Sequence, residues 1–305
     1  MMKNTPVLIT GCQRSGTTLL NLILDSHPQI RGMDEGDFYE DLLDEYLTHP
    51  KYSPYVTFKL PKISHLVPAL QRVSGIKILW CLRDPRDVIT SMLKLDWKLY
   101  MKAGLKDTLL WSLRNPDKAM ASIIKLKSVP ISVSWSSYPH GARSEIEKSA
   151  KALKHRKLVT QELAGYWDRY QTLKQKNPLR FTREDEVFIG ALCWRLKQEM
   201  LNICRPDENM YVVQYEKLIQ DPETEIHAIL QFLNIPWHEN VMKHHLLHSD
   251  ISIGKTESSR PIDAKNLEKW KAFLSEDDVK TIEQICADAA KDFYNFNSLQ
   301  ALAAL

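Results

Sequence analysis

The sequence predicts an α/β fold in which a parallel sheet is flanked by helices and carries a large helical insertion. Strand and helix patterns alternate through the first third of the chain, which favours a doubly wound parallel sheet. A glycine-containing loop of the type that holds phosphate groups joins the first strand to the first helix. From about residue 98 to 183 the strand patterns fade. A chain of 305 residues is long enough to form one elaborated domain.

Short apolar runs define the elements of the first third. Residues 6–10 are apolar and rich in β-branched side chains, as in a buried parallel strand. Leu19–Leu24 predict a buried helix that begins near Thr17 and stops at His27 and Pro28. The same patterns predict an acidic segment at 34–45, strands at 55–58 and 77–82, and helices at 63–73 and 85–97.

The segment from about 98 to 183 is predicted as a helical insertion. A polar stretch, Ser144–Lys176, carries one apolar helical face, formed by Leu163, Tyr166, Tyr170 and Leu173. The insertion acts either as a stabilising cap or as a lid over an acceptor pocket, since long insertions in compact domains are often functional. A non-helical loop within it offers candidate lining residues: Trp135, Ser136, Ser137, Tyr138 and His140.

The core is predicted to resume at Glu184 with a helix whose apolar residues recur at every fourth position from Phe188. A strand at 211–214 follows, and then a helix that ends before Pro236. The final helix repeats apolar residues from Ile282 onwards. We therefore take residues 1–305 as a single domain with one insertion.

The loop at residues 11–18 is suited to binding an oxyanion. Backbone N–H groups around Gly16 can converge on one anion, and the helix after it adds the positive end of its dipole. The glycine spacing is that of the nucleoside triphosphatase loop, but Thr17 stands where that loop has lysine, so Arg14 must supply the charge. The loop is therefore P-loop-like, with an ordinary strand-to-helix turn as the alternative. The expected anion ligands are Arg14, Ser15, Gly16, Thr17 and Thr18.

A second cationic segment follows the strand at 77–82. It begins with Arg83 and reads Arg-Asp-Pro-Arg, whereas a triphosphatase needs a carboxylate near this point to hold Mg²⁺. A cationic strand end is better suited to a second anion than to a metal. A salt bridge from Arg83 to Asp84 or Asp87 is the alternative role for this arginine.

Together these two motifs resemble those of the sulfotransferases that use 3′-phosphoadenosine 5′-phosphosulfate. The likeness covers about residues 6–95 and 184–295 and is closest to the tyrosylprotein sulfotransferase branch and its bacterial relatives. It implies that the first loop holds the 5′-phosphosulfate of this co-substrate and that the second segment holds its 3′-phosphate. It also implies a P-loop-like parallel sheet, with no metal.

The resemblance extends to the catalytic residues. In that branch an acidic segment after a Leu-Asp-x-His-Pro motif holds the catalytic glutamate, and an ungapped count places it at Glu35, with Asp34 and Asp37 as rivals. The family lysine that stabilises the leaving phosphate falls on Lys59, alongside Arg14. Another branch uses a histidine base two residues after this lysine, where this chain has Pro61.

Further nucleotide contacts are implied in the same way. Arg83 and Ser91, eight residues apart, match the pair that holds the 3′-phosphate, and Tyr215 matches a tyrosine near the nucleotide. The C-terminal nucleotide loop of the family corresponds to a segment that contains Lys265. The branch has an arginine two residues after its catalytic glutamate, but this chain has Asp37, which argues against an acidic peptide as acceptor.

The implied function is sulfuryl transfer by an in-line mechanism to a hydroxyl on a small molecule, glycan, lipid or peptide. A small-molecule P-loop kinase and a non-catalytic nucleotide-binding relative are the alternatives. The net charge of +3 is too small to indicate nucleic-acid binding, and no apolar run approaches a membrane span. Five cysteines without C-x-x-C spacing suggest reduced thiols in the cytoplasm. The histidines at 244, 245 and 248 are expected on a surface helix, and homodimer formation is left open.

Overall fold

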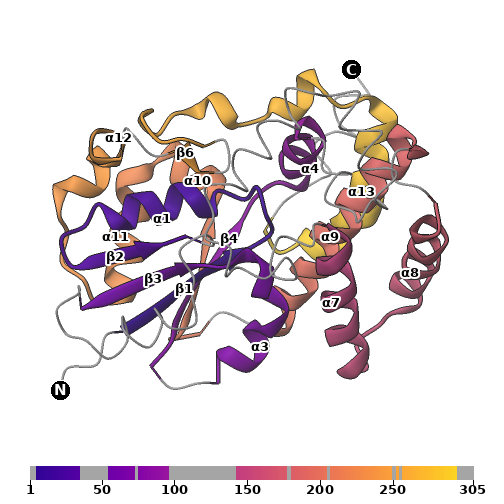
Figure 1. The fold of residues 1–305 in the computed structure, drawn as a ribbon, viewed down its shortest axis with the longest axis horizontal. Coiled ribbons are helices and arrows are strands. Elements are labelled where there is room, and N and C mark those ends of the chain that lie inside the picture. The colour runs from indigo at the N-terminus through magenta and orange to yellow at the C-terminus, as the bar shows by residue number, and fades with distance from the viewer. Residues whose placement is uncertain are drawn as a thin grey trace, which may run out of the picture.

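The computed structural model describes residues 5–34, 54–72, 75–95, 142–176, 180–204, 207–248, 252–253 and 256–293. Its centre is a five-stranded sheet in the order β2-β3-β1-β4-β5, in which every neighbouring pair is parallel (Figure 1). The strands are β1 (Thr5–Gly11), β2 (Ile30–Met33), β3 (Tyr55–Lys59), β4 (Lys77–Leu82) and β5 (Met210–Gln214). The predicted α/β class with a parallel sheet is confirmed.

Helices cover both faces of this sheet. Along β4, Ile78, Trp80 and Leu82 face one apolar core, whereas Leu79 and Cys81 face the other, as the alternation of a strand requires. The first core includes residues of α4 (Pro85–Lys94), α7 (Ala142–His155), α8 (Gln161–Lys174), α9 (Arg183–Cys204) and α13 (Glu276–Ala290). The second includes residues of α1 (Thr17–Asp25), α10 (Tyr215–Gln220) and α11 (Pro222–Leu233).

The strand register brings four loops to one edge. Gly11 at the end of β1 lies beside Cys81 of β4, and Lys59 at the end of β3 lies beside Ile9 of β1. Leu82 of β4 lies beside Gln214 of β5. In such sheets ligands bind beyond the carboxyl ends of the strands. The loops after β1, β3, β4 and β5 therefore all begin where a ligand is expected.

Two elements of the first third differ from expectation. A short edge strand, β2, was not predicted, because its four residues include an arginine and a glycine and give no clear alternation. The helix expected at 63–73 is divided into η1 (Pro61–Leu66) and α3 (Val67–Leu70). Pro68 lies within this stretch and has no N–H for the hydrogen bond of a continuous α-helix.

The described part of the insertion consists of two helices, α7 and α8, instead of one long stretch. The chain turns between them, where Lys157 has a positive φ of 57° and the Thr160 side chain caps α8. Ile146 of α7 and Tyr170 of α8 are buried in the same core as the sheet. Residues 98–141, including the predicted pocket-lining loop, lie outside the described residues.

After α11 the chain runs past α1 to α4 in short elements: η4 (Glu239–Lys243), α12 (His244–Leu247), β6 (Ser252–Ile253), β7 (Thr256–Glu257), η5 (Ala264–Asn266) and η6 (Lys269–Ala272). The surface location expected for His244 is wrong, since this side chain is fully buried and His248 is nearly so. Of the helices that the structure describes, none is long and apolar enough to cross a membrane.

Candidate functional site

The loop between β1 and α1 requires glycine at both ends. Gly11 has φ of 132°, and a Cβ atom there would lie 2.2 Å from the Cys81 carbonyl oxygen of the neighbouring strand. Gly16 has φ of 88°, and a Cβ atom there would lie 2.4 Å from the Tyr215 ring. Both positions combine a conformation that glycine favours with a backbone approach that only glycine permits. The loop is therefore more closely packed than an ordinary strand-to-helix turn.

Arg14 occupies the turn of this loop in a left-handed conformation, with φ of 71°. Such a conformation costs on the order of 1 kcal/mol for a residue with a Cβ atom, so its surroundings must hold it in place. The Nε of Arg14 donates to Ser91 Oγ at 3.0 Å, and an Arg83 N–H donates to the Arg14 carbonyl at 3.0 Å. The loop is thus held from α4 and from the end of β4.

A buried cation lies at the start of α1. The Lys59 ammonium is 3.3 Å from Thr18 Oγ1 and forms an ion pair with Asp34, which follows β2. Lys59 and Thr17 are both buried, each with 5% of the residue exposed. The Ser15 hydroxyl is buried and has no hydrogen-bond partner among the residues that the structure describes. A helix N-terminus with a nearby cation and an unsatisfied hydroxyl is suited to an oxyanion.

Arg83 lies on the other side of the loop. Its guanidinium stacks on the Tyr215 ring at 4.3 Å and donates to the Asn266 carbonyl at 2.5 Å, which brings the C-terminal segment to the site. Trp194 Nε1 donates to the Arg83 carbonyl at 3.1 Å and fixes the backbone. Burial raises the pKa of Tyr215, despite the opposing charge of Arg83, so its phenol stays protonated at neutral pH.

The salt-bridge alternative for Arg83 is only weakly satisfied. The Asp84 carboxylate is bound by Arg86, with the closest contact at 2.6 Å. Asp87 lies 3.8 Å from Arg83, but it accepts closer bonds from the backbone N–H groups of Glu268 and Trp270. The buried Nε of Arg83 has no hydrogen-bond partner in the described part of the chain. One donor of this cation is therefore unsatisfied among the described residues.

Comparison with known proteins identifies the family. A model described as the sulfotransferase domain matches residues 4–294, which is nearly the whole chain. The chain belongs to the sulfotransferase family. It is 32% identical over 96 residues to a protein-tyrosine sulfotransferase A of Caenorhabditis elegans, covering 29% of this chain and 25% of that protein.

Two further matches cover most of this chain. It is 25% identical to protein-tyrosine sulfotransferase 1 of Danio rerio, over 88% of this chain and 66% of that protein. The chain thus spans less than two thirds of the length of the Caenorhabditis elegans and Danio rerio proteins. A solved sulfotransferase domain from the Synechococcus PCC 7002 olefin synthase is 14% identical with a TM-score of 0.49, covering 92% of this chain and 94% of that one. The family membership rests on the domain match.

Most residues that the family resemblance implied come together at this edge of the sheet. They are Arg14, Ser15, Gly16, Thr17, Thr18, Lys59, Arg83, Ser91 and Tyr215. Lys265 adjoins Asn266, which Arg83 contacts, but its own side chain is exposed. Glu35 and Asp37 lie outside the described residues, although Asp34 lies at the site.

The sequence reasoning missed one charged residue of this region. Lys197 of α9 is 1% exposed and donates to the Gly11 carbonyl, to the Gln13 side chain and to the Pro61 carbonyl. The apolar stripe from Phe188 marked α9 as a core helix, and a lysine beside that stripe looks like a solvent-facing residue. In the structure α9 is buried on almost all sides, so a charged side chain within it must have polar partners.

Proposed function

We propose that this protein transfers a sulfuryl group from 3′-phosphoadenosine 5′-phosphosulfate to an acceptor hydroxyl. The observation that carries the proposal is a pair of buried cations: Lys59 at the end of β3 and Arg83 directly after β4. These strands flank β1, which leads into the loop at residues 11–18, here called the anion loop. Two separate cationic positions around one loop fit a nucleotide that carries two anionic groups. Membership of the sulfotransferase family supports the same reaction.

The donor would be held by groups from several elements. Arg14, Thr17 and Thr18 with the loop N–H groups would bind the 5′-phosphosulfate, where the unsatisfied Ser15 hydroxyl offers a further bond. Arg83 and Ser91 would bind the 3′-phosphate, and the free Nε of Arg83 supports this role. Tyr215 and Lys265 would border the nucleotide. These ligands are donors and cations, so the site requires no metal.

In the transfer step the acceptor oxygen forms a bond to sulfur in line with the leaving phosphate oxygen. The sulfur–oxygen bond to the 5′-phosphate breaks, and Lys59 and Arg14 stabilise the charge that remains on that phosphate. Glu35 takes the acceptor proton. The family resemblance supports this role, and the residue before it in the sequence, Asp34, contacts Lys59. Because Asp34 is already paired with a lysine, it is the weaker candidate for the base.

The acceptor class is inferred from the names of the curated relatives and from one charged residue in the sequence. The names of the curated relatives point to a tyrosine hydroxyl of a peptide. Asp37, where the resembling branch carries arginine, would repel an acidic peptide. We therefore propose an acceptor hydroxyl on a neutral or basic peptide or on a small molecule, with the helical insertion at about 98–183 as the candidate lid.

Substitution of Glu35 tests the chemical step. Glu35→Gln should leave donor affinity unchanged and lower turnover by about 10²- to 10⁴-fold, the usual contribution of a positioned base. The assay supplies sulfur-labelled donor and a host metabolite extract in the presence of a chelator, and mass spectrometry finds the product that gains a sulfate. Asp34→Asn is the matched control. If Asp34→Asn abolishes turnover while Glu35→Gln does not, the base is misassigned. The absence of any sulfated product with the wild-type protein would contradict the proposed function.

A further inference from the structure

The Lys197 ammonium connects two segments of the proposed donor site. It lies 3.3 Å from the Gly11 carbonyl, 2.6 Å from Gln13 Oε1 and 3.0 Å from the Pro61 carbonyl. It also forms a buried ion pair with Glu145 of α7. Gly11 and Gln13 belong to the anion loop, whereas Pro61 lies two residues after Lys59. Three N–H donors thus meet four oxygens from three parts of the fold.

Lys197 keeps its charge in this position. Burial lowers the pKa of Lys197, but the charge and hydrogen bond of Glu145 together with the neighbouring Cys12 and Cys193 outweigh burial, so the pKa is raised overall. Stability alone gives little reason for such a pair, since well-packed apolar residues of similar volume often serve a buried site as well or better. The location of its oxygen partners indicates a different role.

These contacts orient the anion loop. The C=O and N–H of one planar trans peptide point in opposite directions. When Lys197 holds the Gly11 carbonyl, the N–H of Cys12 is directed away from the lysine. Arg83 holds the Arg14 carbonyl, but the N–H of that peptide, that of Ser15, donates to the Cys12 carbonyl at 3.2 Å and so closes the turn within the loop. A loop that turns N–H groups toward an anion needs donors for its outward carbonyls, and Lys197 provides one for Gly11.

We propose that Lys197, paired with Glu145, is a positioning residue. It holds the anion loop and the turn from Lys59 to Pro61 in the geometry that binds the donor. The inference rests on the proposed function, in which this loop holds the 5′-phosphosulfate. Because Glu145 belongs to α7, the pair also ties the helical insertion to the donor side of the site.

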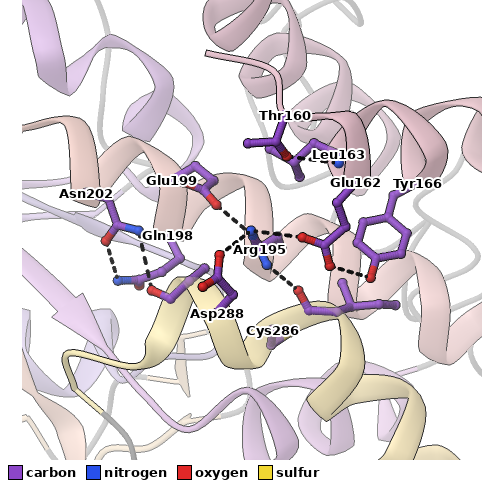
Figure 2. A network of polar contacts seen from close by, with 12 residues as sticks. Thr160, Glu162, Leu163, Tyr166, Arg195, Gln198, Glu199, Asn202, Cys286 and Asp288 are labelled. Atoms are coloured by element: carbon purple, nitrogen blue, oxygen red, sulfur yellow. Dashed lines mark hydrogen bonds and ion pairs between the residues drawn. The ribbon is translucent and has the colours of Figure 1, made fainter.

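The same helix supplies a matched control. Arg195 lies two residues before Lys197 and is equally buried, at 1% exposed. Its guanidinium contacts Glu199 at 2.7 Å, the Ile285 carbonyl at 2.9 Å, Asp288 at 3.4 Å and Glu162 at 3.7 Å (Figure 2). All of these partners belong to α8, α9 or α13, and none belongs to the anion loop or to the turn at Pro61. Arg195 is therefore a buried cation with a purely structural environment.

The test separates positioning from stability. The variants are Lys197→Met, the double variant Lys197→Met with Glu145→Leu, and Arg195→Met. Lys197→Met alone leaves Glu145 buried without its lysine, so it should lower both the melting temperature and the affinity for 3′-phosphoadenosine 5′-phosphate. The double variant removes both charges and should regain melting temperature, yet bind the nucleotide roughly tenfold to a hundredfold more weakly than wild type. Arg195→Met should lose stability with little change in affinity among its folded molecules.

A second measurement does not depend on the nucleotide. Amide hydrogen exchange of peptides covering residues 11–18 and 59–62 should speed up in the double variant and stay unchanged in Arg195→Met. If the double variant matches wild type in both exchange and affinity, the positioning role is wrong while the function stands. If wild type itself fails to bind the nucleotide, the proposed function is wrong. In that case hydrogen exchange still tests the positioning role, which is overturned if exchange in the double variant equals that of wild type.

Discussion

Arg83 makes several contacts within the fold and also has one unsatisfied donor among the described residues. Its guanidinium is stacked on Tyr215 and bonded to backbone carbonyls of the anion loop and the C-terminal segment, while Nε remains unsatisfied among the described residues. A planar guanidinium can make these contacts and still bind a phosphate, whereas a lysine ammonium offers only a point charge. Arg83 therefore joins the anion loop to the C-terminal segment at the proposed nucleotide site.

Arg83→Ala should weaken binding of 3′-phosphoadenosine 5′-phosphate by roughly 1.5–3 kcal/mol, the range of a charge-assisted hydrogen bond. The affinity for adenosine 5′-phosphate, which lacks the 3′-phosphate, should fall much less. Calorimetric titration of both nucleotides gives the comparison, with Arg83→Lys as the variant that keeps the charge. An equal loss for the two nucleotides would mean that Arg83 only holds the Arg14 carbonyl and that the 3′-phosphate lies elsewhere.

At the scale of single elements, the anion loop depends on its glycines. Gly16→Ala should abolish nucleotide binding or reduce it strongly, because the new Cβ atom would collide with the Tyr215 ring. Gly75→Ala is the matched control, since Gly75 has a similar φ of 86° but nothing within 4 Å of the added atom. It should cost about 1 kcal/mol of stability through backbone strain alone. The loop account would be contradicted if both variants bound the nucleotide as wild type does.

The elements that could be predicted are those whose signal is local. The anion loop, β1, β4 and the ends of α1 follow from neighbouring residues, and the strand order then places Lys59 and Arg83 on either side of that loop. Lys197 could not be predicted in this way, because its role comes from the packing of α9 against a loop far away in the sequence. The helix expected at 63–73 is divided because Pro68 has no N–H for the hydrogen bond of a continuous helix.

At the scale of the whole molecule, the buried histidine of α12 links stability to pH. Burial lowers the pKa of His244 to about 4, with further lowering from His245 and His248. Between the ordinary value of 6.5 and about 4, the unfolded chain therefore binds more protons than the folded one. The free energy of unfolding should fall as pH decreases through this window, by on the order of 3 kcal/mol for this residue.

Chemical denaturation at several pH values measures this dependence. His244→Leu should flatten the curve between pH 6.5 and 4 relative to wild type, since the titrating group is removed. His155→Leu replaces an exposed histidine and should leave the slope unchanged. Equal slopes for wild type and His244→Leu would show that His244 takes up a proton without loss of the fold.

The central claim is that the loop after β1 and the end of β4 together hold a nucleotide with two anionic groups without a metal. Calorimetric titration of wild type with 3′-phosphoadenosine 5′-phosphate in a chelating buffer tests it most directly. We expect micromolar-range binding that Mg²⁺ does not improve and that exceeds the binding of adenosine 5′-phosphate. No binding under these conditions, or Mg²⁺-dependent binding and turnover of ATP in its place, would contradict the account.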